Sequence, residues 1–216
     1  MFETAVHDGR LARGERTRTA VLDAAVSLAT EAGLDGLSLA QLAQRLGVSK
    51  SGLFAHWRSK EELQLATIDR ARDQWAERVV APAMRAPRGV RRIYALHEAR
   101  MGFYEKAVLP GGCFFANAEF EYSVRPGVVR DRLVELFREW MCLLERLVGD
   151  AVAAGELPSD TDLPQLAFEI EALGMVAVVQ SRLLPPTPAY AYARRAVRDR
   201  LRMLCRDPSL LPEVDA

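Results

Sequence analysis

The residues with the clearest chemical purpose lie between positions 49 and 60, where small and polar side chains surround a few cations. Lys50-Ser51-Gly52 offers hydrogen bonds and a positive charge with little bulk, which suits close approach to another surface. Lys60 lies in the first turn of a predicted helix, where free backbone amides also favour phosphate. Such groups donate to phosphates and base edges, so they predict a DNA contact. The DNA-contact candidates are Arg16, Arg18, Ser38, Ser49, Lys50, Ser51, Gly52, Ala55, His56 and Lys60.

Two short helices joined by a tight turn are predicted to position these residues. Ser38 can cap a helix over 39–46, and Gly47 can end it because the left-handed conformation costs glycine little. A second helix follows at 50–55, and Ser59 opens a third with a capping-box glutamate three residues on. This spacing predicts a helix-turn-helix whose second helix enters a major groove. The alternative, a helical hairpin inside a bundle, would carry more apolar bulk in that second helix.

Individual roles within the second helix stay open at this stage. Lys50 contacts either a guanine or, as we favour, a phosphate, because a lone lysine lacks the bidentate fork of arginine. Gly52 permits close approach or is only a weak point in the helix. His56 donates to a phosphate or packs beside Trp57. Core positions are predicted for Val48, Leu53 and Trp57.

The charge distribution supports a nucleic-acid partner for the N-terminal end. Residues 10–60 carry eight cations against four anions, a net charge of +4, whereas the whole chain is neutral. A first helix predicted over 15–32 would place Arg16 and Arg18 near the DNA backbone. Arg10 and Arg13 form either an arm in a neighbouring minor groove or a disordered tail, since residues 1–12 are expected to fray.

The segment from about Thr17 to Leu63 resembles the DNA-binding domain of the TetR family of transcriptional regulators. The matching residues are Ala24-Ala25, Leu28, Gly33, Gly36, Ser38, Leu42-Ala43, Gly47-Val48-Ser49, Leu53-Phe54, His56-Trp57 and Ser59-Lys60-Glu61-Glu62-Leu63. The resemblance implies that Lys60 contacts phosphate, that a helical C-terminal domain binds an inducer, and that the protein is a homodimer. The chain departs from the family at Phe54, where tyrosine is usual, so that no hydroxyl is available to donate to phosphate. It also departs at Ala55, where an aromatic or polar residue is common; the alanine methyl either packs on a thymine methyl or touches nothing.

The C-terminal part is rich in large apolar side chains interspersed with polar ones, and the resemblance implies a ligand chamber there. Any single aromatic residue among them is as readily explained as ordinary bundle core. The ligand-binding candidates are His97, Met101, Phe103, Tyr104, Phe114, Asn117, Glu119, Trp140, Met141 and Met175. A buried glutamate without a partner in this region would favour a cationic or hydrogen-bonding ligand.

The three cysteines, Cys113, Cys142 and Cys205, are scattered and odd in number, which favours reduced thiols in a cytoplasmic protein. Cys113 lies at the start of a predicted helix, so a thiol sensor, or an enzyme that pairs Cys113 with His97 or a glutamate, is the competing hypothesis. An inert buried thiol is favoured because its neighbours are apolar. No nucleophile motif, phosphate loop or metal-ligand spacing is found, so we expect neither an enzyme, a cofactor nor a metal site.

The last two predicted helices have the composition of a subunit interface. Small residues, which permit close helix approach, alternate there with valines and leucines; packing within one chain is the alternative. The residues concerned are Ala172, Leu173, Gly174, Val176, Ala177, Val178, Val179 and Ser181, then Ala189, Ala191, Ala193, Ala196, Val197, Leu201 and Leu204. A four-helix interface, two helices from each subunit, fits both the pattern and the resemblance.

Together these patterns predict an all-α fold: an N-terminal three-helix DNA-binding domain with a helix-turn-helix (residues 13–60) and a helical C-terminal ligand-binding and dimerisation domain (61–206). Further helices are predicted near 59–80, 90–108, 112–122, 127–154, 163–183 and 188–206. Apolar runs are too short for a membrane span, and the N-terminus lacks a secretory signal. We therefore expect a cytoplasmic repressor that binds a palindromic DNA operator as a homodimer and responds to a small-molecule effector. An activator, or an architectural DNA-binding protein without an inducer, is the alternative.

Overall fold

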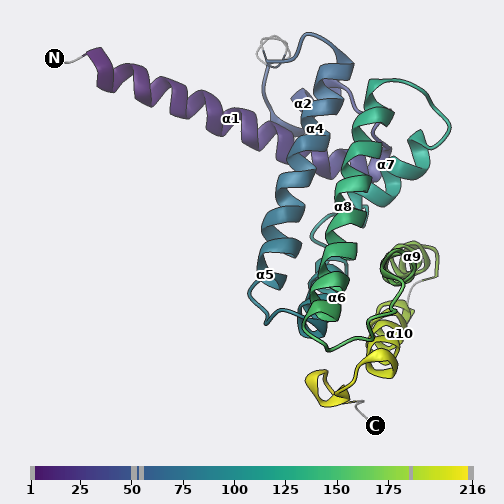
Figure 1. The fold of residues 1–216 in the computed structure, drawn as a ribbon. Coiled ribbons are helices and arrows are strands. Elements are labelled where there is room, and N and C mark those ends of the chain that lie inside the picture. Colours follow the sequence, from purple (N-terminus) through teal and green to yellow (C-terminus); the bar gives the residue numbers. More distant parts are fainter. Residues whose placement is uncertain (1–2, 50–52, 54–55, 185–186, 214–216) are drawn as a thin grey trace. The chain divides into compact units, whose positions relative to one another are not determined.

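The computed structural model describes residues 3–49, 53, 56–184 and 187–213, with side chains described from Thr17 onward. Every regular element in these ranges is helical, which confirms the predicted fold class (Figure 1). The N-terminal elements are α1 (Glu3–Ala32), α2 (Leu39–Leu46), α4 (Lys60–Trp75), a π-helical turn (Ala76–Val80) and α5 (Ala81–Ala83). The later elements are α6 (Val90–Glu105), α7 (Phe114–Tyr122), α8 (Val128–Ala153), α9 (Leu163–Leu183), α10 (Ala189–Leu204) and a 3₁₀ turn (Pro208–Leu210).

Among the described residues, predicted and observed helix boundaries agree closely from α2 onward, and the main difference is at the N-terminus. The helix predicted at 50–55 lies outside the described residues. Helix α1 begins at Glu3, well before the predicted start at residue 15, so residues 3–12 are helical rather than frayed. The physical reason is that no proline interrupts this stretch, and its alanine, leucine, arginine and glutamate residues favour helix enough to offset two glycines.

The chain forms two compact units that do not follow the order of the sequence. Unit 1 comprises residues 1–73 and 109–133, and unit 2 comprises residues 74–108 and 134–216. Helix α7 therefore belongs with the N-terminal helices, where it packs against α1. The predicted division at residue 60 did not anticipate that the middle of the chain returns to the N-terminal helices.

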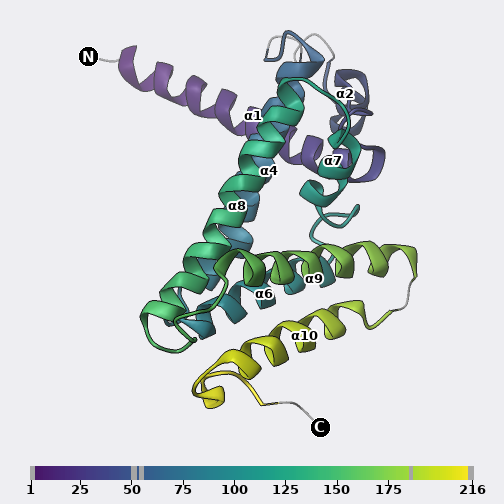
Figure 2. The same ribbon diagram turned by 45° about the vertical axis from the view of Figure 1, so that its right-hand side comes forward.

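Each unit has its own apolar core. In unit 1 the helices α1, α2 and α4 bury Val26, Leu42, Leu63 and Ile68 almost completely. In unit 2, α10 packs against both α6 and α9, and Figure 2 shows α9 and α10 as neighbouring antiparallel helices. Helices α4 and α8 contribute to both units, because the division falls after Asp73 in α4 and after Leu133 in α8.

Candidate DNA-binding site and buried polar cluster

The local frame of the predicted helix-turn-helix is present in the described residues. Ser38 is the N-cap of α2, and its hydroxyl accepts the backbone N–H of Gln41 at 3.2 Å. Gly47 ends the helix in the left-handed conformation with φ of 64°, which is cheap only for glycine. Helix α4 begins in the same way, because the Ser59 hydroxyl accepts the N–H of Glu62 at 3.0 Å. These three predictions are confirmed.

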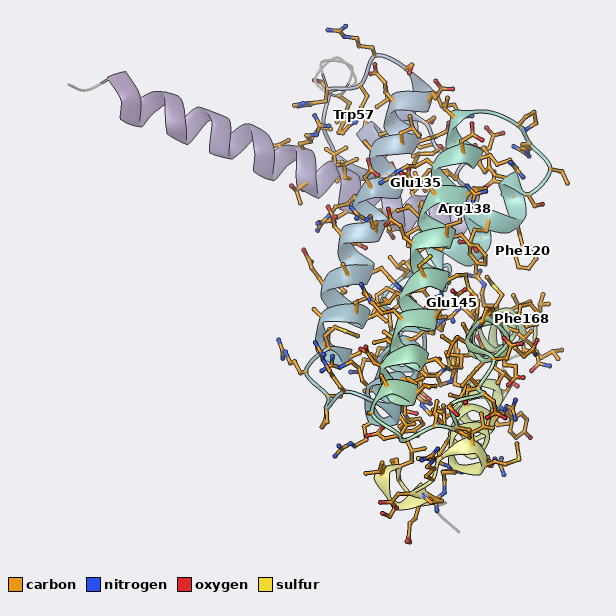
Figure 3. The ribbon with its side chains drawn as sticks, in the orientation of Figure 1. Trp57, Phe120, Glu135, Arg138, Glu145 and Phe168 are labelled. Carbon is orange, nitrogen blue, oxygen red and sulfur yellow. The ribbon has the colours of Figure 1, made fainter. Side chains whose placement is uncertain are left out.

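Between α2 and α4, Leu53 and Trp57 are each only 2% exposed, which confirms their predicted place in the core. Trp57 is labelled in Figure 3. The Arg18 guanidinium lies over the Trp57 ring, 5.5 Å from its centre, in a cation–π contact. His56 is exposed, with its ring 5.5 Å from that of Trp57, so it is available at the surface while touching the tryptophan. Val48, which was predicted to be buried, is 44% exposed, because the turn after Gly47 directs it outward.

Several predicted DNA contacts cannot be placed. Lys50, Ser51, Gly52 and Ala55 lie outside the described residues, as does the side chain of Arg16. Ser49 is exposed at the end of the described turn.

Lys60 is held by an acidic partner that sequence reasoning did not identify. Its Nζ lies 2.9 Å from Oδ1 of Asp35, in the turn between α1 and α2, and both side chains are about half exposed. The second carboxylate oxygen of Asp35 pairs with Nη1 of Arg125 at 3.1 Å. The hydrogen bond from Lys60, followed by the interaction with Arg125, holds the pKa of Asp35 below its ordinary value, so the carboxylate stays charged at neutral pH.

The turn between α1 and α2 is anchored by α7. The Glu121 carboxylate accepts the backbone N–H groups of Leu34 at 2.8 Å and of Asp35 at 2.9 Å. The Gln64 amide donates to the Leu34 carbonyl at 3.0 Å and to the Tyr122 hydroxyl at 2.9 Å. Buried backbone groups must find partners, and here residues far along the chain supply them. The position of the turn, and with it of Asp35, therefore depends on α7.

The end of α1 is anchored through the loop before α7. Gly111 donates its N–H to the Thr30 hydroxyl at 2.9 Å, and Asn117 donates its amide to the carbonyls of Thr30 and Gly111 at 3.1 and 3.0 Å. A Cβ atom at Gly111 would overlap the backbone of Thr30, so the close approach requires glycine.

Unit 2 contains a buried ion pair between α6 and α9. Arg100 is 4% exposed and donates to both oxygens of Glu171, at 2.7 and 3.0 Å. Its Nε donates to the Tyr104 hydroxyl at 3.0 Å, while Trp140 donates its indole N–H to Glu171 at 2.6 Å. Burial alone would lower the pKa of Arg100, but Tyr104 and Glu171 outweigh it and raise the pKa above its ordinary value. Both charges are thus paired and desolvated.

Aromatic rings enclose the ion pair. The Arg100 guanidinium lies 5.8 Å from the centre of the Tyr104 ring and 5.7 Å from that of Trp140. The Trp75 ring lies edge-on to Trp140, with 5.6 Å between centres. Gly174 on α9 lies under the guanidinium, and a Cβ atom there would overlap it. We call Arg100, Glu171, Tyr104, Trp140 and Trp75 the arginine cluster.

His97 lies one helical turn before Arg100 and is 1% exposed. In the part of the chain that the structure describes, neither imidazole nitrogen has a hydrogen-bond partner of good geometry. Burial, and secondarily the Arg100 charge, lowers the pKa of His97 to about 3, against a smaller opposite influence from the Ala193 backbone. The ring is therefore neutral at physiological pH.

Two segments of the chain match models of known protein families. Residues 21–67 match the family model for bacterial regulatory proteins of the tetR family, and residues 89–197 match the tetracyclin repressor-like C-terminal domain. The chain belongs to the TetR family. Members of this family are DNA-binding transcriptional regulators and usually ligand-responsive repressors, so the predicted recognition is confirmed. The family is not one of enzymes.

Individual relatives agree with this assignment. The HTH-type transcriptional repressor ComR of Escherichia coli is 28% identical over 151 residues, which cover 69% of this chain and 72% of ComR. A TetR transcriptional regulator from Chloroflexus aurantiacus has a similar structure, with a TM-score of 0.83, 26% identity and coverage of 90% of this chain and 98% of that one. AibR, solved with isovaleryl coenzyme A and operator DNA, shares the fold at a TM-score of 0.64 and 19% identity, covering 86% and 96% of the two chains.

The ten predicted ligand-binding residues of this TetR-family chain fall in both units. Unit 2 holds His97, Met101, Phe103, Tyr104, Trp140, Met141 and Met175. Phe114, Asn117 and Glu119 lie on α7 in unit 1, and the Asn117 amide nitrogen is used to hold α1. Sequence reasoning missed Arg100 and Glu171 because they are 71 residues apart and share no motif. A charged residue at a core position of each helical pattern was the only available signal.

Some of the residues predicted to form the subunit interface are instead buried within the chain. Gly174, Ala177, Ala193 and Val197 are buried between α6, α9 and α10, so they are not free to contact another subunit. Two residues of the predicted interface, Val176 and Val179 on α9, remain exposed. They are joined by exposed apolar residues that were not predicted: Phe168 and Leu183 on α9, with Tyr192 and Met203 on α10. Figure 3 shows Phe168 directed away from the helices. By length and composition α9 could also span a membrane, but a core helix that carries an apolar surface stripe passes the same test.

The structure also places the cysteines. Cys113 is 4% exposed and its sulfur accepts the Ala116 N–H at 3.4 Å, as the N-cap of α7. Cys205 is buried, whereas Cys142 is exposed. The inaccessible Cys113 gives no support to the thiol-sensor alternative.

Proposed function

We propose that this TetR-family protein is a repressor that binds a palindromic operator as a homodimer and releases it when a small-molecule effector binds. The observation that carries the proposal is the frame formed by Ser38, Gly47 and Ser59. It brackets the Lys50-containing segment and presents Lys60 at the surface. In a two-fold dimer the two recognition helices would lie about one DNA turn apart, or slightly more.

The dimer contact would use the exposed apolar stripe on α9 and α10. Val176, Val179 and Leu183 recur at the spacing of one helix face and are 36–73% exposed. Apolar area of this kind is costly to leave in water, and a self-complementary patch suits a two-fold axis. The stripe supports a contact between α9 and α10 of one subunit and the same helices of its partner.

The effector would act through the arginine cluster and its neighbours in unit 2, including His97, Met101 and Phe103. A polar or charged effector group can replace one member of the Arg100–Glu171 pair and so change how α6 and α9 pack. Helix α4 provides the route to the DNA-binding residues, because Lys60 is its first residue and Trp75, in the cluster, its last. A coupling of about 1–3 kcal/mol would change operator affinity about 5–150-fold.

The test uses DNA from upstream of the protein's own gene. Fluorescence anisotropy with labelled upstream fragments should show tight binding that competitor DNA of unrelated sequence does not remove, and footprinting should protect two symmetric half-sites. Sedimentation should give a dimer for the wild type and a monomer for Val179→Glu. Ala154→Glu, which adds the same charge at another exposed position, serves as the control. A monomeric wild type, or protection of one asymmetric site, would contradict the proposal.

A further inference from the structure

Lys60 and Arg125 form a pair of cations around a single carboxylate. Lys60 contacts Oδ1 of Asp35 at 2.9 Å and Arg125 contacts Oδ2 at 3.1 Å. The three side chains are 52%, 49% and 50% exposed, so the two positive charges face solvent side by side. Lys60 belongs to the DNA-binding segment, whereas Arg125 follows α7 and is 65 residues away in sequence.

Arg125 has a fixed position beside Lys60. Its backbone N–H donates to the Tyr122 carbonyl at 3.2 Å, and its guanidinium lies 5.5 Å from the centre of the Tyr122 ring. Glu121 lies 4.0 Å from the same guanidinium, but its oxygens already accept the Leu34 and Asp35 N–H groups. Nη1 is the only guanidinium nitrogen of Arg125 that takes part in these ion pairs, so donors remain for another anion.

We propose that Arg125 is a second DNA-phosphate contact and that Asp35 occupies the place of a backbone phosphate in the DNA-free protein. The inference rests on the proposed DNA-binding function. Asp35 presents two oxygens to the two cations, as a phosphate does, and it keeps both side chains ordered before DNA arrives. On the duplex the phosphates take over these contacts, and Asp35 becomes a competing anion that limits affinity.

The chemistry favours phosphate over a purely structural role for Arg125. An exposed ion pair gains little in water, so exchange of one anion for another is cheap. Arginine contacts phosphate through two parallel donors, which a monodentate contact with Asp35 leaves unused. The residues around Gly33 already have their backbone partners in Glu121 and Gln64, so the turn does not need Arg125 to satisfy its amides.

The experiment measures binding of the full-length protein to a mixed-sequence duplex as a function of salt concentration. Non-specific binding depends on phosphate contacts alone, so no operator is needed. The salt slope is the steepness with which the logarithm of the binding constant falls as the logarithm of the salt concentration rises. Arg125→Gln should lower this slope by about 0.9 for each phosphate that it no longer neutralises, or by about 1.8 for a dimer that binds through both of its DNA-binding domains. Lys60→Gln should do the same, Arg125→Lys should retain the wild-type slope, and Asp35→Asn should raise affinity about two- to fivefold.

Arg138→Gln is the matched control, because it removes the same charge from an exposed position on α8 (Figure 3). Its slope should equal that of the wild type, and the melting temperature of each variant shows whether it is folded. If Lys60→Gln lowers the slope and folded Arg125→Gln does not, the role of Arg125 is refuted while the proposed function stands. If the wild type binds no duplex at any salt concentration, the proposed function fails, and this inference with it.

Discussion

The buried imidazole of His97 makes a quantitative prediction about stability and pH. In the folded protein its pKa is about 3, whereas an unfolded histidine titrates near 6.5. A depressed folded pKa means that the unfolded chain binds a proton that the folded chain does not. The stabilising difference is fully present above pH 6.5 and is lost as the pH falls from there toward 3.

The size of the effect follows from these two pKa values. Between pH 7 and pH 5 the unfolded histidine becomes almost fully protonated while the folded one stays neutral, which costs about 2 kcal/mol of unfolding free energy. For a chain of this size, a loss of that order lowers the melting temperature by about 4–8 °C. Replacement by a similarly sized apolar residue removes the titrating group and gives up only the weak Ala193 backbone contact, since among the described residues neither nitrogen has a hydrogen-bond partner of good geometry.

The assay is urea unfolding of the wild type and of His97→Leu at both pH values. At neutral pH the variant should be at least as stable as the wild type. Between pH 7 and 5 the wild type should lose about 2 kcal/mol more than the variant, because all carboxylates titrate alike in both proteins. Equal losses in the wild type and His97→Leu would refute the reasoning.

Two further substitutions test long-range contacts of the fold. Gly174→Ala should displace the Arg100 guanidinium and destabilise the protein by about 3 kcal/mol in urea unfolding, the scale of a broken buried ion pair. Gly149→Ala, whose Cβ meets only ordinary contact, should instead stabilise by about 0.5–1 kcal/mol, and a similar result for both variants would contradict the assigned clash. Glu121→Gln replaces an acceptor of two backbone N–H groups by an amide with one oxygen, so thermal unfolding should show a loss of about 1–3 kcal/mol. An unchanged melting temperature would mean that the turn between α1 and α2 does not depend on α7.

The parts of the fold that were predicted from sequence depend on neighbours along the chain. Ser38, Gly47 and Ser59 act on backbone groups within four residues, so their types and spacing suffice to locate the helix ends. The positions of α6 to α10 were predicted from apolar residues that recur three and four positions apart, which is again a pattern among near neighbours in the sequence. The extra length of α1 was missed because no cap or breaker marks its start.

The partners of the functional side chains could not be predicted in this way. Asn117 was predicted to contact a ligand because its side chain is polar and lies among apolar residues, yet its amide donates to the Thr30 carbonyl at the end of α1. Gly174 was predicted to contact another subunit because it is small, yet the space beside it is occupied by the Arg100 guanidinium of the same chain. In both cases the residue type indicates close approach or hydrogen bonding but does not say to what.

What the sequence determined by itself is the all-helical character of the protein, the helix-turn-helix frame and its basic charge, because these follow from interactions a few residues apart. The tertiary structure alone decided that Lys60 meets Asp35, that Glu121 holds the turn 87 residues before it, and that Arg100 pairs with Glu171. Such pairs form only when the burial of apolar faces brings distant helices together. A charged side chain then pairs with the partner that this packing places within reach, and no local pattern records which one it is.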